Sequence, residues 1–325
     1  MCARLPPRLF AEQKSTPPRE GNYWETLMIF TVTLNPAIDY VLQTDDLRIG
    51  EVNRALRTEL FYGGKGINVS GVLTSFKVPN TALGFAAGFT GKALCDGLDS
   101  LGINNDFVTL KSGMTRINVK LKSPLDTDIN TPGPFAEKTD IRRLSDKLKA
   151  AEKGDFICLS GSIPQGIDSG VYSDIMGEFE GINFIVDTTG EALFKALPHR
   201  PFLIKPNIDE FSELFDEEIS SDTEIIDSAK KLQEMGARNV LVSLGPNGAL
   251  LVCEDGTCHK CGVPPGVARN TVGAGDSMIA GFLYEYLKNG DMAAALKTAV
   301  AAGSATAYSD QLATFEYTRK LLEEM

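Results

Sequence analysis

The residues best suited to chemistry are 271–277, with the sequence TVGAGDS, which directly precede an apolar helical run at 278–287. A turn of small residues that opens a helix leaves several backbone N–H groups without helical partners, and with the helix dipole they attract an anion. Gly273 and Gly275 have no Cβ atom, so a ligand can approach the backbone closely. Asp276 lies in the first turn, beside the expected anion. An anion hole next to a carboxylate base predicts phosphoryl transfer to a hydroxyl group.

This turn also has a simpler interpretation, because Gly-Ala-Gly-Asp before a helix suits a strand-to-helix connection with an acidic residue in the first helical turn. A Walker A loop is excluded, since no Gly-Lys-Ser/Thr follows. The two histidines do not compete with Asp276 as the base. His199 lies in a proline-flanked turn, and His259 lies between two cysteines.

A second glycine-rich segment, FYGGKG at 61–66, precedes another predicted helix. Gly63 and Gly64 allow the backbone to approach a sugar. Lys65 can meet a phosphate as a point charge, and Asn68 points back toward the same end of the helix. A loop with a solvated lysine explains the same residues without a ligand.

Three polar residues of strand-like segments are candidates for substrate binding. Asp39, just beyond the first predicted strand, can accept hydrogen bonds from sugar hydroxyls, or it is an exposed turn carboxylate. Arg116 and Asn118 are two residues apart, so a strand places both on one face. An arginine there can bind a phosphate through a bidentate fork, and a solvent-facing strand arginine is the simpler alternative.

Lys205, Asn207 and Glu210 lie where a predicted strand enters a helix. A lysine beside nucleotide phosphates and a glutamate that holds hydrated Mg²⁺ fit this position, because Mg²⁺ keeps several waters and few protein ligands. Helix capping by Asn207, with Glu210 three residues on, is the alternative, and the two interpretations are compatible.

Two segments of small residues are candidates for contact with a nucleotide. The turn SLGPNG begins at Ser243 and ends at Gly248, with Gly245 inside it, and it can border a base or ribose. The segment AAGS, which contains Gly303, lies in a predicted helix of small residues that can admit a flat adenine. A bare turn and close helix packing explain these two segments equally well.

Strand-like and helix-like runs alternate along the chain, which predicts a parallel sheet with right-handed crossovers. The predicted strands are 29–34, 81–87, 155–160, 182–187, 201–205 and 238–243. The predicted helices are 66–77, 90–101, 139–152, 168–179, 222–235, 275–288 and 291–308. Polar clusters follow five of the strands, at 35–39, 160–164, 187–190, 205–210 and 243–248. Because ligands bind beyond the carboxyl ends of the strands in such a sheet, we expect a site at this edge.

Residues 38–62 and 106–123 interrupt the alternation, because they have strand-like patterns without long helices between them. Residues 115–121, in the second segment, alternate polar and apolar side chains. The two segments predict a small second sheet that covers one end of the main sheet. Such a sheet can close over substrate as a lid or pair with another subunit.

The composition narrows the class of protein. The 325 residues are 43% hydrophobic and 23% charged, which suits one large α/β domain with an accessory element. The net charge of -11 argues against a nucleic-acid partner. No apolar run reaches transmembrane length, so no membrane partner is expected. Residues 1–27 lack the apolar core of a signal peptide, and we expect them to be a disordered extension or a tag, or Met28 to be the natural start. A cytoplasmic protein is expected.

The six cysteines are scattered through the chain and do not suggest a disulfide scaffold. Cys258 and Cys261 have the CxxC spacing of a zinc site, but a second pair is missing. We therefore expect a surface hairpin tip with two ordinary thiols.

Taken together, these segments resemble the PfkB (ribokinase-like) family of carbohydrate kinases, from Met28 almost to the C-terminus. The resemblance is carried by GGKG at 63–66, NxxE at 207–210 and NTVGAGDS at 270–277. Within the family, the hexose-phosphate branch is indicated by TLNPAID at 33–39, TRIN at 115–118 and SGSIP at 160–164. Residues 1–27 match nothing in the family.

The resemblance implies a three-layer α/β/α fold in which residues 28–325 form a single kinase domain, with a small β-sheet lid through which a homodimer forms. It implies an ATP- and Mg²⁺-dependent kinase for a ketohexose phosphate, with fructose 1-phosphate as the expected acceptor and tagatose 6-phosphate as the alternative. A non-catalytic relative that senses a sugar phosphate stays open, although a sensor needs no base. A Rossmann dehydrogenase has no support, since no GxGxxG follows the first strand.

By the same resemblance, Asp276 takes the proton from the attacking hydroxyl, and the N–H groups of Gly273, Ala274 and Gly275 stabilise the transferring group. The expected contacts of the sugar are Asp39, Gly63, Gly64, Asn68, Asn118 and Ser160, and those of its phosphate are Lys65 and Arg116. The expected contacts of the nucleotide are Lys205, Asn207, Ser243, Gly245, Gly248, Thr271 and Gly303, and Mg²⁺ is expected at Glu210.

Overall fold

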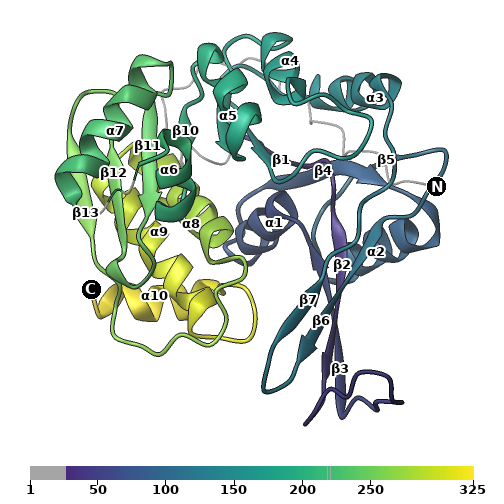
Figure 1. Cartoon of the computed structure of the whole chain (residues 1–325). Coiled ribbons are helices and arrows are strands. Elements are labelled where there is room, and N and C mark those ends of the chain that lie inside the picture. Colours follow the sequence, from purple (N-terminus) through teal and green to yellow (C-terminus); the bar gives the residue numbers. More distant parts are fainter. Residues whose placement is uncertain (1–26, 218, 220) are drawn as a thin grey trace, which may run out of the picture.

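The computed structural model describes residues 27–217, 219 and 221–325, which form two β-sheets with helices packed mainly around the larger one (Figure 1). The larger sheet has nine strands in the order β13-β12-β11-β10-β9-β8-β1-β4-β5, and the smaller has four in the order β3-β2-β6-β7. Only the pairings of β12 with β11 and β13 are antiparallel in the larger sheet. The predicted α/β class, a mostly parallel main sheet with a small second sheet, is confirmed.

The strands of the larger sheet are, in chain order, β1 Ile29–Thr33, β4 Asn80–Ala86, β5 Val108–Thr109, β8 Phe156–Ser160, β9 Asn183–Asp187, β10 Leu203–Ile204, β11 Asn239–Ser243, β12 Ala249–Val252 and β13 Cys258–Cys261. Those of the smaller sheet are β2 Ala37–Gln43, β3 Arg57–Gly63, β6 Arg116–Lys122 and β7 Thr127–Ile129. The helices are α1 Lys65–Ser75, α2 Gly88–Ser100, α3 Lys138–Leu148, α4 Val171–Gly177, α5 Gly190–Ala196, α6 Ile208–Phe215, α7 Asp222–Glu234, α8 Ala274–Asn289, α9 Met292–Ala307 and α10 Phe315–Glu323, with short 3₁₀ turns at Leu197–His199 and Gly245–Asn247.

The central strands of the larger sheet are covered on both faces. Every residue of β1, β4 and β8 is buried, which explains why these segments are almost continuous apolar runs in the sequence. The register places Thr33 opposite Ser160, and Ser160 opposite Asp187. The carboxyl ends of β1, β8 and β9 therefore meet at one edge, where the sequence predicts the site.

Two helical layers sandwich the larger sheet. Helices α3 to α7 contribute to one hydrophobic cluster, against side chains such as Val32 and Leu159. Helices α1, α8, α9 and α10 contribute to a second cluster on the other face, against side chains such as Cys158 and Leu241. This arrangement brings the start of α8 and the start of α1 to the same side of the sheet, and the two helices pack against each other.

The smaller sheet projects from the larger one beside α1 and α2 (Figure 1). Its alternating sequence gives it two different faces. Asp39, Asn118 and Arg116 share one face, because Asp39 pairs with Asn118 and Arg116 lies two residues before Asn118. Apolar side chains occupy the other face, where the row Leu60, Tyr40, Val119 and Ile129 runs across all four strands.

The prediction of 106–123 as one segment of the small sheet is partly wrong. Val108–Thr109 pairs in parallel with β4 and so belongs to the larger sheet. Only Arg116–Lys122 of this segment enters the small sheet, and Thr127–Ile129 extends it beyond the predicted range. A strand of two residues has too little pattern to reveal which sheet it joins.

Two other expectations concern the ends and the surface of the chain. Of the predicted N-terminal extension, residues 1–26 lie outside the described residues, and Leu27 packs against the second hydrophobic cluster. The expected CxxC hairpin tip is wrong, because Cys258–Cys261 forms the edge strand itself and the turn precedes it. Within the described ranges, no helix has the length and apolar composition needed to cross a bilayer.

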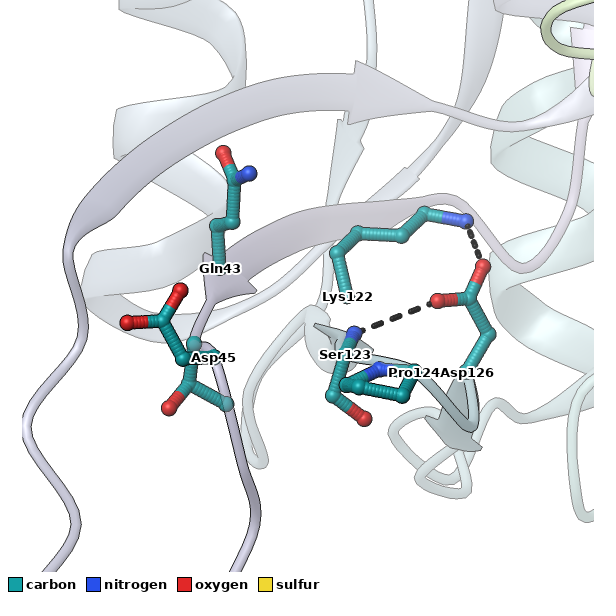
Figure 2. A pocket seen from close by; sticks show the side chains of 7 residues that line it. Gln43, Asp45, Lys122, Ser123, Pro124 and Asp126 are labelled. Carbon is teal, nitrogen blue, oxygen red and sulfur yellow. Dashed lines mark hydrogen bonds and ion pairs between the residues drawn. The ribbon is translucent and has the colours of Figure 1, made fainter.

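A shallow hollow of about 280 Å³ lies at the outer end of the small sheet (Figure 2). It is lined by Gln43, Thr44, Asp45, Lys122, Ser123, Pro124 and Asp126. Lys122 Nζ lies 2.6 Å from Asp126 Oδ2, and the Ser123 N–H donates to Asp126 Oδ1 at 3.3 Å. These contacts close the turn between β6 and β7. Because Gln43 and Lys122 lie at the opposite ends of their strands from Ala37 and Arg116, the hollow is separate from the candidate site.

Candidate active site

The start of α8 forms one wall of the candidate site. Gly273 is the N-cap residue with φ 77°, a left-handed conformation that glycine adopts without strain. A methyl group at Gly275 would lie 2.8 Å from Lys205 Nζ, so the missing side chain lets the lysine reach the helix start. The Ala274 N–H donates to the Thr271 carbonyl oxygen at 3.2 Å. The predicted anion hole therefore lacks the Ala274 N–H in this conformation, because the turn itself already uses that donor.

Asp276 is a buried carboxylate in the first turn of α8, with 6% of its surface exposed. Its Oδ2 accepts a hydrogen bond from Asn68 Nδ2 at 2.8 Å, which links α8 to α1. Burial, and then the negative charge of Asp187, raise the pKa of Asp276 to about 6, against the opposing effects of Asn68, Lys205 and Lys65. A carboxyl group with this pKa is poised to accept a proton near neutral pH.

Two lysines and the carboxylate of Asp187 act on Asp276 through their charges, and Glu210 joins the cluster through Lys65. Asp187 Oδ1 is 3.1 Å from Lys65 Nζ and 3.7 Å from Lys205 Nζ. Lys65 Nζ is also 3.9 Å from Glu210 Oε1. Lys65 thus lies at Asp187 and Glu210, whereas the resemblance implies a place beside Arg116 at the phosphate of the sugar.

Asn207 and Glu210 form the capping box that the sequence allows. The Glu210 N–H donates to Asn207 Oδ1 at 2.8 Å, and the Asn207 N–H donates to Glu210 Oε2 at 2.9 Å. The other carboxylate oxygen, Oε1, faces Lys65. Capping therefore fixes the orientation of Glu210 and leaves one oxygen facing Lys65, so the capping interpretation is confirmed and the role of Glu210 in holding Mg²⁺ stays a prediction.

The polar face of the small sheet supplies a second wall. Asn118 Nδ2 donates to Asp39 Oδ1 at 2.8 Å, and Asn118 Oδ1 accepts from the Thr131 N–H at 3.3 Å. Asn118 is buried, so it positions Asp39. A methyl group at Gly63 would lie 2.7 Å from Asp39 Oδ2, which explains the glycine on the neighbouring strand.

Arg116 lies at the base of the same face. Its Nε donates to the Asn35 carbonyl oxygen at 3.2 Å, which leaves the rest of the guanidinium for another partner. Burial lowers the pKa of Arg116, and the charge of Asp39 opposes that effect. The residue stays protonated, because the ordinary pKa of an arginine lies far above neutral pH. A half-desolvated guanidinium of this kind suits a phosphate or carboxylate ligand.

Buried polar atoms without partners gather at the adjoining strand ends. Among the described residues, six buried side-chain oxygens or nitrogens have no hydrogen-bond partner, and three of them are Asn35 Oδ1, Ser160 Oγ and Asp187 Oδ2. These three residues lie at or just beyond the ends of β1, β8 and β9, which are adjacent in the sheet. Since native proteins rarely leave such atoms unsatisfied, their concentration here indicates a ligand site.

The segments predicted to contact a nucleotide differ in what they do. Ser243 ends β11 and forms a bridge with Asn207, so the turn at Gly245 and Gly248 borders the same edge of the sheet. Gly303 instead lies inside α9, where a methyl group would be 2.6 Å from Met278 Cγ. Its small size serves the packing of α9 on α8, and its contact with an adenine stays a prediction.

Sequence reasoning missed three residues as parts of the site. Asp187 and Asn35 were recognised only as members of polar clusters after strands, and their positions at strand ends were the available signal. Tyr172 gave no signal, since it lies on α4 and is fully buried. Its hydroxyl donates to the carbonyl oxygens of Ser160 and Gly161, at 3.2 and 3.0 Å, and so fixes the loop after β8.

The described residues contain no group of three or more His, Cys, Asp or Glu side chains arranged to hold a metal ion. Mg²⁺ needs fewer protein ligands, because it commonly takes one or two carboxylates together with water and substrate phosphates. Glu210 and the unpartnered oxygen of Asp187 satisfy that smaller requirement.

Comparison with known proteins gives matches along almost the whole chain. The family described as "pfkB family carbohydrate kinase" matches residues 28–316. A 1-phosphofructokinase of Bacillus subtilis is 40% identical over 300 residues, which cover 92% of this chain and 98% of the relative. A D-tagatose-1-phosphate kinase of Bacillus licheniformis is 36% identical over 289 residues, 88% of this chain and 94% of the relative. The structure of phosphofructokinase-2 from Escherichia coli in complex with fructose-6-phosphate is similar with a TM-score of 0.85 and 29% identity, and the match covers 92% of this chain and 99% of that one.

Proposed function

This chain belongs to the pfkB family of carbohydrate kinases, and on that premise we propose that it transfers the γ-phosphoryl group of ATP to fructose 1-phosphate and so makes fructose 1,6-bisphosphate. The observation that carries the proposal is the buried Asp276 carboxylate at the start of α8, with Lys205 and Lys65 beside it. This is a base next to a site for phosphoryl charge. The near full-length similarity to 1-phosphofructokinases supports the choice of acceptor.

In the proposed reaction the C6 hydroxyl oxygen of fructose 1-phosphate attacks the γ-phosphorus, and the bond to the bridging oxygen of ADP breaks. Asp276 takes the hydroxyl proton. The N–H groups of Gly273 and Gly275 and the Lys205 ammonium stabilise charge on the transferring group. Asp39, positioned by Asn118, accepts hydrogen bonds from sugar hydroxyls, and Arg116 binds the phosphate already on C1.

ATP and Mg²⁺ fit the residues that are present. Lys205 lies at the helix start, where nucleotide phosphates are expected, and Asn207 and Ser243 border the same edge. Glu210 and Asp187 would hold Mg²⁺, each offering a carboxylate oxygen on that side. When bound, Mg²⁺ neutralises charge on the phosphates of ATP. The small sheet, as a lid, would exclude water that competes as acceptor.

The position of the new phosphate on the sugar product tests the proposed reaction. We expect ³¹P NMR of the protein with Mg-ATP and fructose 1-phosphate to show one ADP formed for each new phosphomonoester, at C6 of the sugar. A second candidate acceptor is tagatose 1-phosphate, because the similar protein of B. licheniformis is named a D-tagatose-1-phosphate kinase. This sugar phosphate differs from fructose 1-phosphate only in configuration at C4. Tagatose 6-phosphate, the alternative from the sequence, has no such support, because the name of that relative places the phosphate on C1. ATP hydrolysis without a sugar product would contradict the proposal.

Activity is expected to fall at acid pH. Asp276 acts as a carboxylate, and its pKa of about 6 means that protonation removes the base as the pH drops through that value. Because kcat/KM reports the groups of the free enzyme, we expect it to be level above about pH 7 and to fall about tenfold per pH unit below the pKa. A profile that stays level down to about pH 5 would exclude Asp276 as the base.

Association through the small sheet is part of the same proposal, and so is a cytoplasmic location. Tyr40, Leu60 and Ile129 lie in one cross-strand row on the apolar face and are 36%, 49% and 52% exposed. A second copy of the chain would cover this row. Light scattering is expected to give twice the chain mass of 35.1 kDa, and Leu60→Glu is expected to give the single chain mass. A single chain mass for the unaltered protein would contradict the dimer.

A further inference from the structure

Lys65 makes the contacts of a bound cation. Its ammonium lies 3.1 Å from Asp187 Oδ1 and 3.9 Å from Glu210 Oε1, and the charge of Asp276 also acts on it. The three carboxylates come from three elements: the end of β9, the first turn of α6 and the first turn of α8.

An independent observation indicates that this position also suits another ligand. Asp187 is 2% exposed, and its Oδ2 has no hydrogen-bond partner. A buried carboxylate oxygen without a donor or cation is costly, so a ligand is expected to supply one. The two carboxylates that contact Lys65 are also the two that would hold the Mg²⁺ carried by ATP.

The side chains of the two lysines at Asp187, Lys65 and Lys205, differ in how far they can move. The Lys205 side chain is 5% exposed and is confined against Gly275. The Lys65 side chain is 34% exposed and follows Gly64, so its flexible stem can swing without moving the core. Lys65 is thus the cation that can leave the carboxylates.

We propose that the Lys65 ammonium occupies the divalent-cation position between Asp187 and Glu210 in the nucleotide-free enzyme, excludes free metal from it, and yields it to the Mg²⁺ that arrives with ATP. The proposal rests on the kinase function above, because it assigns the two carboxylates to the metal of the nucleotide. It makes Lys65 a positioning residue: its displacement coincides with nucleotide binding and frees an ammonium beside the phosphates.

Binding of Mn²⁺ without nucleotide or sugar tests the proposal, with electron paramagnetic resonance as the readout. We expect the unaltered protein to bind Mn²⁺ weakly, and Lys65→Met to bind one Mn²⁺ per chain at least about tenfold more tightly, because a positive charge has been removed from between two carboxylates. Lys65→Arg keeps the charge and is expected to behave like the unaltered protein. Lys120→Met is the matched control, since Lys120 pairs with Asp128 on the small sheet.

Equal Mn²⁺ affinity of Lys65→Met and the unaltered protein would overturn the proposal. Tight binding of one Mn²⁺ by the unaltered protein in the absence of nucleotide would also overturn it, and that measurement needs no variant. The experiment contains neither ATP nor sugar, so a failure here is distinguishable from a failure of the proposed phosphoryl transfer.

Discussion

Replacement of Asp276 by Asn is expected to lower kcat by about 10³-fold, within the 10²- to 10⁴-fold range typical of a general base. The amide has the size of the carboxylate and can still accept the hydrogen bond from Asn68, so the shape of the site is kept. It cannot accept the hydroxyl proton at neutral pH. The measurements are the rate of ADP formation at saturating substrates and the Kd for nucleotide by calorimetry, which is expected to change little.

The fold of this variant is expected to be retained at neutral pH. The pKa of Asp276 is higher in the folded chain than its ordinary value, so above about pH 6 the charged carboxylate lowers the free energy of unfolding. Replacing it with a neutral amide is therefore not expected to lower that free energy further. Asp209→Asn is a matched control, because Asp209 lies exposed in the first turn of α6 and is expected to keep full activity. A kcat for Asp276→Asn equal to that of the control would remove Asp276 from the mechanism.

Replacement of Arg116 by Ala is expected to raise the KM for the sugar phosphate by about 10- to 100-fold, which corresponds to losing a charge-assisted hydrogen-bond pair. The KM for ATP is expected to stay within about twofold, since Arg116 lies on the small sheet and contacts Asn35, whereas Lys205 follows β10 of the larger sheet. Steady-state kinetics with each substrate varied in turn separates the two effects.

Two variants sharpen the Arg116 experiment. Arg116→Lys keeps the charge but loses the planar guanidinium, so its KM for the sugar phosphate is expected to lie between those of the unaltered protein and Arg116→Ala. Arg57→Ala removes an exposed arginine from β3 of the same sheet, where its partner is Glu59, and is expected to leave both KM values unchanged. An increase confined to the KM for ATP would show that Arg116 serves the nucleotide and not the sugar phosphate.

The parts of the fold that could be predicted are those whose sequence pattern has a single physical meaning. The run at Ile29–Thr33 is apolar because both of its faces are covered, and the alternation at Arg116–Lys122 arises because its two faces differ. Short helices and strands contain too few residues for a periodic pattern of apolar side chains to predict them. Helices α5 and α6, of 7 and 8 residues, and the two-residue β5 are defined by what packs around them.

The site could be predicted where one segment contains both the backbone geometry and the reactive group, as residues 271–277 do. It could not be predicted where partners come from distant segments. The pairing of Lys65 with Asp187 spans 122 residues, and a long lysine stem can reach either substrate from the same backbone position. For Gly303, the sequence allows helix packing and a ligand surface alike, and the close approach to Met278 supports the packing interpretation.

The most direct test of the proposed function is the kcat/KM of the purified protein with Mg-ATP and each of four acceptors: fructose 1-phosphate, tagatose 1-phosphate, tagatose 6-phosphate and fructose 6-phosphate. We predict the highest value for fructose 1-phosphate, because a phosphate on C1 held by Arg116 presents the C6 hydroxyl to Asp276. A higher value for tagatose 1-phosphate would keep the mechanism and change the substrate. Absence of ADP formation with all four would contradict the assignment of this chain as a sugar-phosphate kinase.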